Sequence, residues 1–139
     1  MAVFIGESKD TCAVRAALAI NHAVAHIINP ALKSHYSENL KDFQVRHSVG
    51  IDTSKVMAAR TGVRGANDLV WVGRSANYAA KLCALRDGNY ATWITGDVYD
   101  KMAGTVKMTT DGTKNMWEGR VWTAQSGLRI FRSSYSWAL

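Results

Sequence analysis

Apolar positions recur with a helical period in the first third of the chain. Residues 11–28 form an alanine-rich stretch that predicts a helix with a broad apolar face, made of Val14, Leu18, Ile20, Val24, Ile27 and Ile28. Ser8 or Asp10, in the turn before it, is the expected N-cap. Asn29-Pro30 is expected to close or bend this helix, with a short helical piece running on to His35.

Strand-like patterns lie on either side of this helix. MAVFI at residues 1–5 predicts a short buried strand, and the polar SENLKD at residues 37–42 predicts a loop. FQVRHSVGID at residues 43–52 alternates apolar and polar positions and predicts a half-buried strand, and KVMAART predicts the next strand. LVWVG at residues 69–73 is apolar on both sides, which favours burial on both faces under a layer of helices.

The second half of the chain alternates helices and strands. The predicted elements are, in chain order, a helix over residues 74–86 ending near Asp87-Gly88, the strand YATWIT, the short helix GDVYDKMA, a polar hairpin or loop TVKMTTDGTKNM with its turn at Asp111-Gly112, and two antiparallel strands within RVWTAQSGLRIFRSSY joined at Ser126-Gly127. The whole pattern indicates one domain of the α+β class with a substantial, partly antiparallel sheet.

Composition limits the function classes. With 139 residues, one proline and 47% hydrophobic residues, the chain is long and apolar enough to bury a core of its own. Seventeen Lys and Arg against eleven Asp and Glu give a formal charge of +6, but the basic residues are scattered and form no run. This pattern disfavours a dedicated nucleic-acid-binding domain and leaves a phosphate-bearing ligand open.

The cysteines and the apolar stretches both favour the cytoplasm. Cys12 and Cys83 are too few for a disulfide framework and suit a reducing compartment. The most apolar stretch, AVRAALAINHAVAHII, is interrupted by polar residues, so no membrane-spanning segment is expected. MAVFIGESKD lacks the basic lead and cleavage site of a signal peptide. We therefore expect a cytoplasmic protein with no membrane partner.

Candidate chemistry gathers at the start of the helix over residues 74–86. Its first turn carries Arg74, Ser75 and Asn77, where unpaired N–H groups and the helix dipole favour anions. The alternative is an ordinary helix start, with Ser75 as the N-cap and the first turn in solvent. Asn77 and Lys81 are four residues apart and therefore share a helix face. An amide donor beside a cation suits stabilisation of charge on a transferring phosphoryl group.

Other motifs offer less. His22 and His26 share a helix face, but no third ligand is apparent, so a partner or an interface explains them better than a metal ion. The sequence contains no G-x-S-x-G, P-loop or G-x-G-x-x-G motif. A nucleophilic serine and the common glycine-rich phosphate loops therefore have no support.

Two segments together carry a family resemblance. VRHSVGIDTSKV is followed by DLVWVGRSANYAAKL, after an apolar run and an alanine-rich helix. This succession resembles the class III nucleotidyl cyclase catalytic domain, from residue 1 to about residue 104 and more loosely to the end. With TKNMWEGRVWTA and IFRSSYSW, the chain is most similar to the bacterial pyrimidine cyclases of Pycsar anti-phage systems. The resemblance implies a ferredoxin-like, mainly antiparallel sheet with helices on it, lacking the family's first strand and helices.

The resemblance implies two catalytic residues. Asn77 matches the family asparagine that supports the transition state, and Lys81 stands where the family usually has a phosphate-contacting arginine. A lysine keeps the charge but loses the bidentate fork of arginine. For the family's phosphate-binding lysine, Lys114 and Arg120 both stay open.

The resemblance also implies contacts to the nucleotide from Asp68, Val70, Trp71 and Arg74. Val70 falls where purine cyclases place the polar residue that reads the base, and it makes no such hydrogen bond. This departure argues against ordinary adenine or guanine recognition. A shift of one residue in the alignment moves Asp68 closer to this position and restores a carboxylate.

The family's metal site implies that part of the catalytic domain is missing. Both metal-binding aspartates of the family would precede Met1, so residues 1–139 are expected to be the C-terminal portion of a single cyclase catalytic domain. Divalent Mn or Mg is the implied cofactor, with its ligands upstream of Met1, and Asp52 and Asp100 do not stand at the metal positions. The chain alone is therefore expected to be inactive.

The implied reaction converts UTP, or less readily CTP, to the cyclic monophosphate and diphosphate. The product would act on a separate effector protein in anti-phage defence. Family members are homodimers with sites at the interface, so a homodimer is expected, with no nucleic-acid partner. Two alternatives stay open: a catalytically inactive cyclase-like module that dimerises or binds nucleotide, and a purine nucleotide cyclase.

Overall fold

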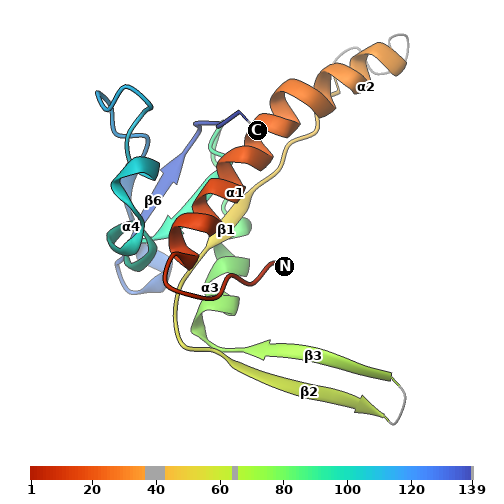
Figure 1. Cartoon of the computed structure of the whole chain (residues 1–139), viewed down its shortest axis with the longest axis vertical. Coiled ribbons are helices and arrows are strands. Elements are labelled where there is room, and N and C mark those ends of the chain that lie inside the picture. The colour runs from red at the N-terminus through yellow and green to blue at the C-terminus, as the bar shows by residue number, and fades with distance from the viewer. Residues whose placement is uncertain (37–42, 64–65, 139) are drawn as a thin grey trace.

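The computed structural model describes residues 1–36, 43–63 and 66–138 of the chain. Its elements are α1 (Lys9–Ala23), the π-helical turn η1 (Val24–Ile28), α2 (Asn29–His35), β1 (Val49–Ile51), β2 (Met57–Val63), β3 (Ala66–Val72), α3 (Arg74–Cys83), β4 (Thr92–Thr95), α4 (Gly96–Lys101), the 3-10 turn η2 (Gly104–Val106), β5 (Glu118–Trp122), the 3-10 turn η3 (Thr123–Gln125) and β6 (Leu128–Ser133). Figure 1 shows a central sheet from which a long helix and a hairpin project in different directions.

The central sheet has four strands in the order β1-β4-β6-β5. β1 is parallel to β4, and the other two pairings are antiparallel. Ile94 in β4 lies opposite Ile51 of β1 on one side and Phe131 of β6 on the other. The turn between β5 and β6 contains Ser126 and Gly127, the position that the sequence predicts, and both residues have positive φ. The mixed, mainly antiparallel sheet confirms the predicted fold class.

Helices cover both faces of this sheet. On one face, α1 and α4 bury a cluster that includes Val14, Leu18, Ile94 and Val98. On the other face, Leu82 of α3 packs with residues of β4, β5 and β6. Alternate residues of β4 therefore face different clusters, which explains why Trp93 and Ile94, neighbours in the strand, are both buried.

α1, η1 and α2 follow one another without a break, so Asn29-Pro30 does not end the helix. A proline lacks the N–H group that an α-helix interior needs, and the π-helical turn just before it accommodates this loss. Ser8 occupies the N-cap position, but its side chain makes no capping hydrogen bond. Asp10 lies in the first turn and is buried.

The helix over Lys9–His35 is long and apolar enough, by length and composition, to cross a membrane, with 28% of its most apolar window buried. The prediction that no stretch meets this condition is therefore wrong. The observation is weak evidence for a membrane segment, because Val14 and Leu18 lie fully buried in the core. The Asn21 amide also donates hydrogen bonds to the carbonyls of Ser134 and Tyr135, which fastens the helix to the C-terminal segment.

Two strand predictions near the N-terminal end are wrong in extent or type. Residues 1–5 form no strand and are exposed. The strand predicted over residues 43–52 is reduced to β1, and Phe43 before it is exposed. The SENLKD loop prediction lies outside the described residues.

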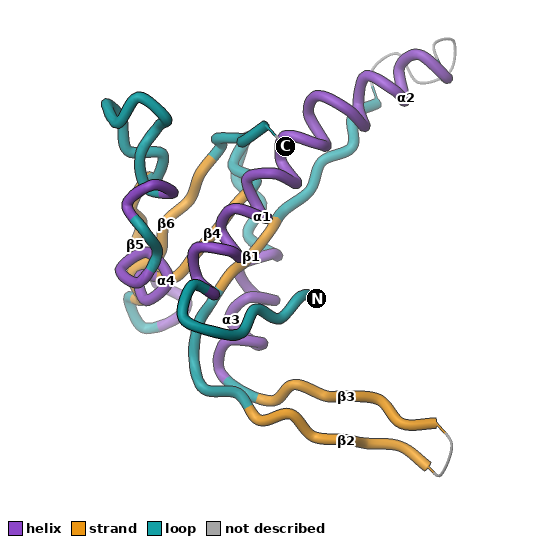
Figure 2. Tube along the Cα trace, viewed as in Figure 1, coloured by secondary structure: helices purple, strands orange, loops and turns teal. Residues whose placement is uncertain are grey.

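β2 and β3 form a separate antiparallel hairpin that pairs with no other described strand. Figure 2 shows this hairpin reaching away from the four-stranded sheet. The prediction that LVWVG is buried on both faces is therefore wrong: Leu69 is 58%, Val70 40% and Val72 50% exposed. The apolar character of the segment is real, but no described helix covers it.

Candidate active site

The start of α3 is fixed by the segment that connects β1 to β2. Gly73 is the N-cap, and the predicted cap Ser75 instead lies inside the first turn. The N–H group of Ser75 donates to the hydroxyl of Ser54 at 3.0 Å, so the capping oxygen comes from another part of the chain. A Cβ atom on Gly73 would lie 2.9 Å from Val56 Cγ1, so glycine permits this close approach.

Asn77 and Lys81 lie on one exposed face of α3. The opposite face of the helix is pressed against β1, where a Cβ atom on Gly50 would lie 2.2 Å from the carbonyl oxygen of Ala79. Neither the Asn77 amide nor the Lys81 ammonium has a hydrogen-bond or ion-pair partner among the described side chains. Both groups are therefore available to a ligand or a second chain.

The residues of the β2–β3 hairpin that are predicted to contact the nucleotide lie on two different faces of the hairpin. Successive residues of a strand point to opposite faces, so Asp68 and Val70 share one face of β3 and Trp71 lies on the other. Trp71 lines a cleft together with residues of β1 and α3. Within one chain, Trp71 and Val70 therefore do not face the same space.

Arg74 is engaged by the protein itself. Its Nη2 atom donates to Asp97 Oδ2 at 2.5 Å and to the carbonyl of Thr53 at 3.0 Å. Its Nε atom lies 3.4 Å from Asp52 Oδ2. The hydrogen bond to Asp97 raises the pKa of Arg74 above its ordinary value, with Asp52 adding to the effect and partial burial opposing it.

Sequence patterns assign no role to Asp52, Thr95 or Asp97, although all three lie beside α3. Asp52 follows β1, and Thr95 ends β4. Because β1 and β4 are parallel, their carboxyl ends meet at one edge of the sheet. There the hydroxyl of Thr95 donates to Asp52 Oδ1 at 2.6 Å. The only sequence signal is a polar residue at the end of each strand, and it becomes informative once the pairing of β1 with β4 is known.

The other predicted phosphate contacts lie away from α3 in sequence and on different elements. Arg120 is on β5 and pairs with Glu118 at 2.6 Å. Lys114 is in the loop before β5, where its backbone N–H group donates to the hydroxyl of Thr109. Neither geometry singles out one of the two as the phosphate-binding residue.

The described residues do not fit a divalent-metal site. They contain no group of three or more His, Cys, Asp or Glu side chains that could hold an ion. The Asp52 carboxylate is already engaged by Thr95 and Arg74, and Asp100 forms an ion pair with Arg129. The rings of His22 and His26 lie with their centroids 4.6 Å apart and their planes tilted by 36°, without a third ligand among the described side chains.

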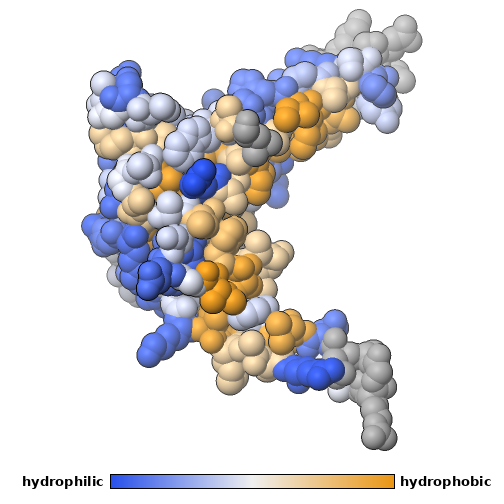
Figure 3. All heavy atoms as spheres, in the orientation of Figure 1, coloured by the Kyte–Doolittle hydropathy of each residue, from blue (hydrophilic) through white to orange (hydrophobic). Residues whose placement is uncertain are grey.

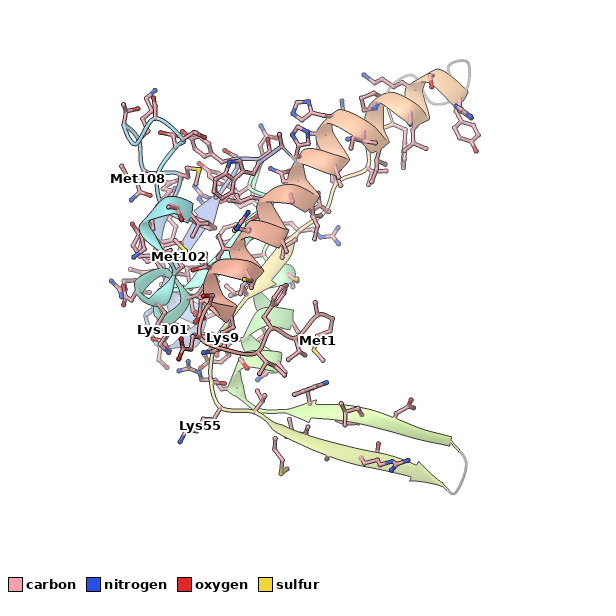
Figure 4. All side chains as sticks on the ribbon, in the orientation of Figure 1. Met1, Lys9, Lys55, Lys101, Met102 and Met108 are labelled. Atoms are coloured by element: carbon pink, nitrogen blue, oxygen red, sulfur yellow. The ribbon has the colours of Figure 1, made fainter. Side chains whose placement is uncertain are left out.

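A cleft of about 240 Å³ lies between α1, β1 and the start of α3. It is lined by residues 1–4, by alanines of both helices, and by the segment 52–54 that follows β1. Figure 4 shows Met1 on the same side of the molecule as α3, with Lys9 at the start of α1 and Lys55 at the base of the hairpin. The cleft therefore borders both the unpaired edge of β1 and the first turn of α3.

Comparison with known proteins shows which proteins the chain is similar to. No protein-family model matches the chain. It is 48% identical over all 139 residues to a uridylate cyclase of Xanthomonas perforans, of which it covers 58%, and 47% identical to one of Burkholderia cepacia, of which it covers 57%. A uridylate cyclase of Rhodovulum sp. is 38% identical over 138 residues.

Solved structures show the same fold at low identity. A bacterial light-regulated adenylyl cyclase matches 96% of this chain with a TM-score of 0.64 at 15% identity, and the chain covers 35% of it. A second such structure matches with a TM-score of 0.59 at 16% identity. The resemblance seen in the motifs is confirmed: the chain is similar to the uridylate cyclases over its own length and spans a little more than half of theirs.

Proposed function

We propose that this chain is part of a pyrimidine nucleotide cyclase that forms cyclic UMP, and less readily cyclic CMP, from the nucleoside triphosphate. The full-length similarity to uridylate cyclases is the observation that carries the proposal. The product would serve as a second messenger for a separate effector protein in anti-phage defence. The place of Asn77 and Lys81, exposed together and without partners among the described side chains, agrees with this assignment.

The reaction needs stabilisation of charge more than covalent chemistry. The 3′ oxygen of the nucleoside forms a bond to the α-phosphorus, the bond from that phosphorus to the diphosphate oxygen breaks, and the 3′ hydroxyl proton is released. The Asn77 amide would donate a hydrogen bond where negative charge develops on the α-phosphoryl group. The Lys81 ammonium, one turn further along α3, would meet the phosphates.

Divalent Mn or Mg would activate the hydroxyl and neutralise the triphosphate. The described residues contain no group of three or more side chains that could hold such an ion, and we propose that its ligands lie in the part of the relatives that this chain does not match. Asn77 and Lys81 act on the phosphates directly, so neither role passes through the metal.

We propose that residues 1–139 form the C-terminal portion of one cyclase catalytic domain. β1 pairs with β4 on one side only within the described residues, and the cleft runs along its other edge. Alanines of α1 and α3 line that cleft, which leaves room for another strand beside β1. The remaining part of the domain would supply this strand.

We further propose a homodimer in which a second copy covers the exposed apolar surface. Figure 3 shows apolar atoms gathered on the side of the molecule between the long helix and the hairpin. The large apolar side chains exposed on the N-terminal segment, the long helix and the hairpin include Met1, Ile5, Ile20, Ile27, Met57, Leu69 and Val72. An exposed apolar surface of this extent is typical of an interface. Because Val70 and Trp71 face different spaces in one chain, a second copy would also complete the site.

The experiment is a nucleotide panel with the full-length gene product. We expect cyclic UMP from UTP in the presence of Mn or Mg, detected by mass spectrometry, and loss of activity in Asn77→Ala. Removing one transition-state donor should lower kcat about 100-fold or more. Asn89→Ala, an exposed asparagine in a turn, is the matched control and should retain full activity.

Other outcomes separate the alternatives. Turnover of ATP or GTP in place of UTP would support a purine cyclase. Binding of UTP in calorimetry without turnover would support an inactive cyclase-like module. Full activity of Asn77→Ala would contradict the role of Asn77 in the transition state.

A further inference from the structure

Arg74 stands at the meeting point of four elements. It is the first residue of α3, and its guanidinium contacts the end of β1 through Asp52, the following loop through Thr53, and the first turn of α4 through Asp97. Its guanidinium also lies over the ring of Tyr78, 5.7 Å from the centroid, on the next turn of α3. The planar fork of arginine serves acceptors in several directions at once, which a lysine ammonium does less well.

The ion pair between Arg74 and Asp52 differs from a surface ion pair because the Asp52 carboxylate is buried. Its side chain is fully buried, and its Oδ2 atom makes no hydrogen bond to a described residue. Thr95 satisfies Oδ1, so the Arg74 guanidinium at 3.4 Å is the described cation that compensates the other oxygen. A buried carboxylate that loses its cation is strongly destabilising, so the first turn of α3 is held where Arg74 can reach Asp52.

Asn77 lies one turn after Arg74 on the same rigid helix, about 4.5 Å further along the axis. Any tilt or fraying of the first turn therefore moves the Asn77 amide. The guanidinium faces two carboxylates, which leaves no surplus positive charge there for a phosphate. Lys81, which has no ion-pair partner among the described residues, is the cation of α3 that a phosphate can reach.

We propose that Arg74 is a positioning residue of the cyclase reaction, which holds the first turn of α3 and the Asn77 amide against the carboxyl ends of β1 and β4 by bridging Asp52 and Asp97. This inference rests on the proposed function. It differs from a direct nucleotide contact by Arg74, because a positioning residue affects the transition state and leaves the binding of UTP unchanged.

The test combines steady-state kinetics with amide hydrogen exchange in the full-length gene product. Arg74→Met should lower kcat by a factor on the order of 100, since a displacement near 1 Å can cost that much, while KM for UTP stays within about twofold. Arg74→Lys should fall between Arg74→Met and the wild type. Asp97→Asn, which changes a half-exposed partner and leaves the buried Asp52 paired, should lower kcat about threefold with KM unchanged. Arg86→Met, an exposed arginine with no ion pair to a described residue, should match the wild type.

Exchange of the backbone amides keeps this test separate from the proposed function. Arg74→Met and Asp97→Asn should speed exchange at residues 75–78 while β4 and β6 keep their protection. A rise in KM at constant kcat in Arg74→Met would show that Arg74 contacts the nucleotide and would overturn the inference. An unchanged kcat in this variant would also overturn it. If the wild type makes no cyclic nucleotide, the proposed function fails. Unchanged exchange at residues 75–78 overturns the positioning role whether or not the enzyme is active.

Discussion

β4 and β3 both contain large apolar side chains, yet their surroundings are opposite. All four residues of β4 are buried, because β1 and β6 flank the strand and helices cover both of its faces. β3 pairs only with β2 among the described strands, and Leu69, Val70 and Val72 are exposed. The same kind of sequence therefore builds a core in one place and an uncovered surface in the other. The two strands differ in the strands and helices that lie against them. This difference supports the proposal that a second chain covers β3.

The largest effect on the free energy of unfolding should come from truncating a buried aliphatic side chain, and truncation of an exposed one provides the comparison. Ile94→Ala removes a fully buried side chain from the centre of the sheet and should lower the free energy of unfolding by about 2–5 kcal/mol. Leu69→Ala removes a side chain that is 58% exposed and should change it by less than about 0.5 kcal/mol. Urea unfolding at a concentration where the protein is monomeric measures both. Equal losses would mean that the hairpin packs against the core of its own chain.

This contrast also marks what can be predicted from sequence. Helical periodicity locates α1 and α3, and the spacing of Asn77 and Lys81 correctly places them on one helix face. Periodicity reports that a segment is apolar, but not what covers it, so it assigns LVWVG to a buried layer. The strand predicted at residues 1–5 fails for a related reason, because a strand needs a neighbour as well as β-favouring residues.

The site is predictable only in its local part. Asn77 and Lys81 belong to one helix, whereas the contacts of Arg74 with Asp52 and Asp97 depend on the parallel pairing of β1 with β4, two strands far apart along the chain. Spacing along the chain contains no signal for such a pairing. The same limit explains why the sequence favours Ser75 as the cap of α3, when the capping oxygen belongs to Ser54.

A charge on the hairpin should break the proposed dimer without unfolding the chain. Leu69→Glu places a carboxylate opposite Arg60 in the β2–β3 pairing, so the hairpin itself keeps a favourable cross-strand pair. Burying that charge in an interface should cost about 3 kcal/mol, which corresponds to a dissociation constant raised about 100-fold. Sedimentation velocity over a range of concentrations measures this shift.

Val121→Glu is the matched control for the hairpin variant. Val121 is 66% exposed on β5 and lies opposite Arg129, so the substitution has the same chemistry on a different surface. We expect its association to equal that of the wild type. If Val121→Glu dissociates the dimer and Leu69→Glu does not, the interface lies on β5 rather than on the hairpin.

The smallest effect concerns an exposed region that is ordered by its own polar contacts. In the turn at Asp111-Gly112, the carboxylate of Asp111 accepts hydrogen bonds from the hydroxyl of Thr109 at 2.5 Å and from the N–H and hydroxyl of Thr113. These bonds, led by that from Thr109, lower the pKa of Asp111 from 3.8 to about 2. The hydrogen bonds of the ionised Asp111 carboxylate therefore stabilise the fold fully above the ordinary pKa of the group. This stabilisation is lost as the pH falls through about 2.

Carboxyl chemical shifts from an NMR titration test this local order. Thr113→Val removes one donor hydroxyl and should move the pKa of Asp111 part of the way back toward 3.8, with no change in the unfolding of the core at neutral pH. A wild-type Asp111 that titrates at its ordinary value would show that the turn is not held by these bonds in solution. The expected result would distinguish two kinds of exposed segment in this molecule: a polar turn ordered by its own hydrogen bonds, and an apolar hairpin for which we propose a partner.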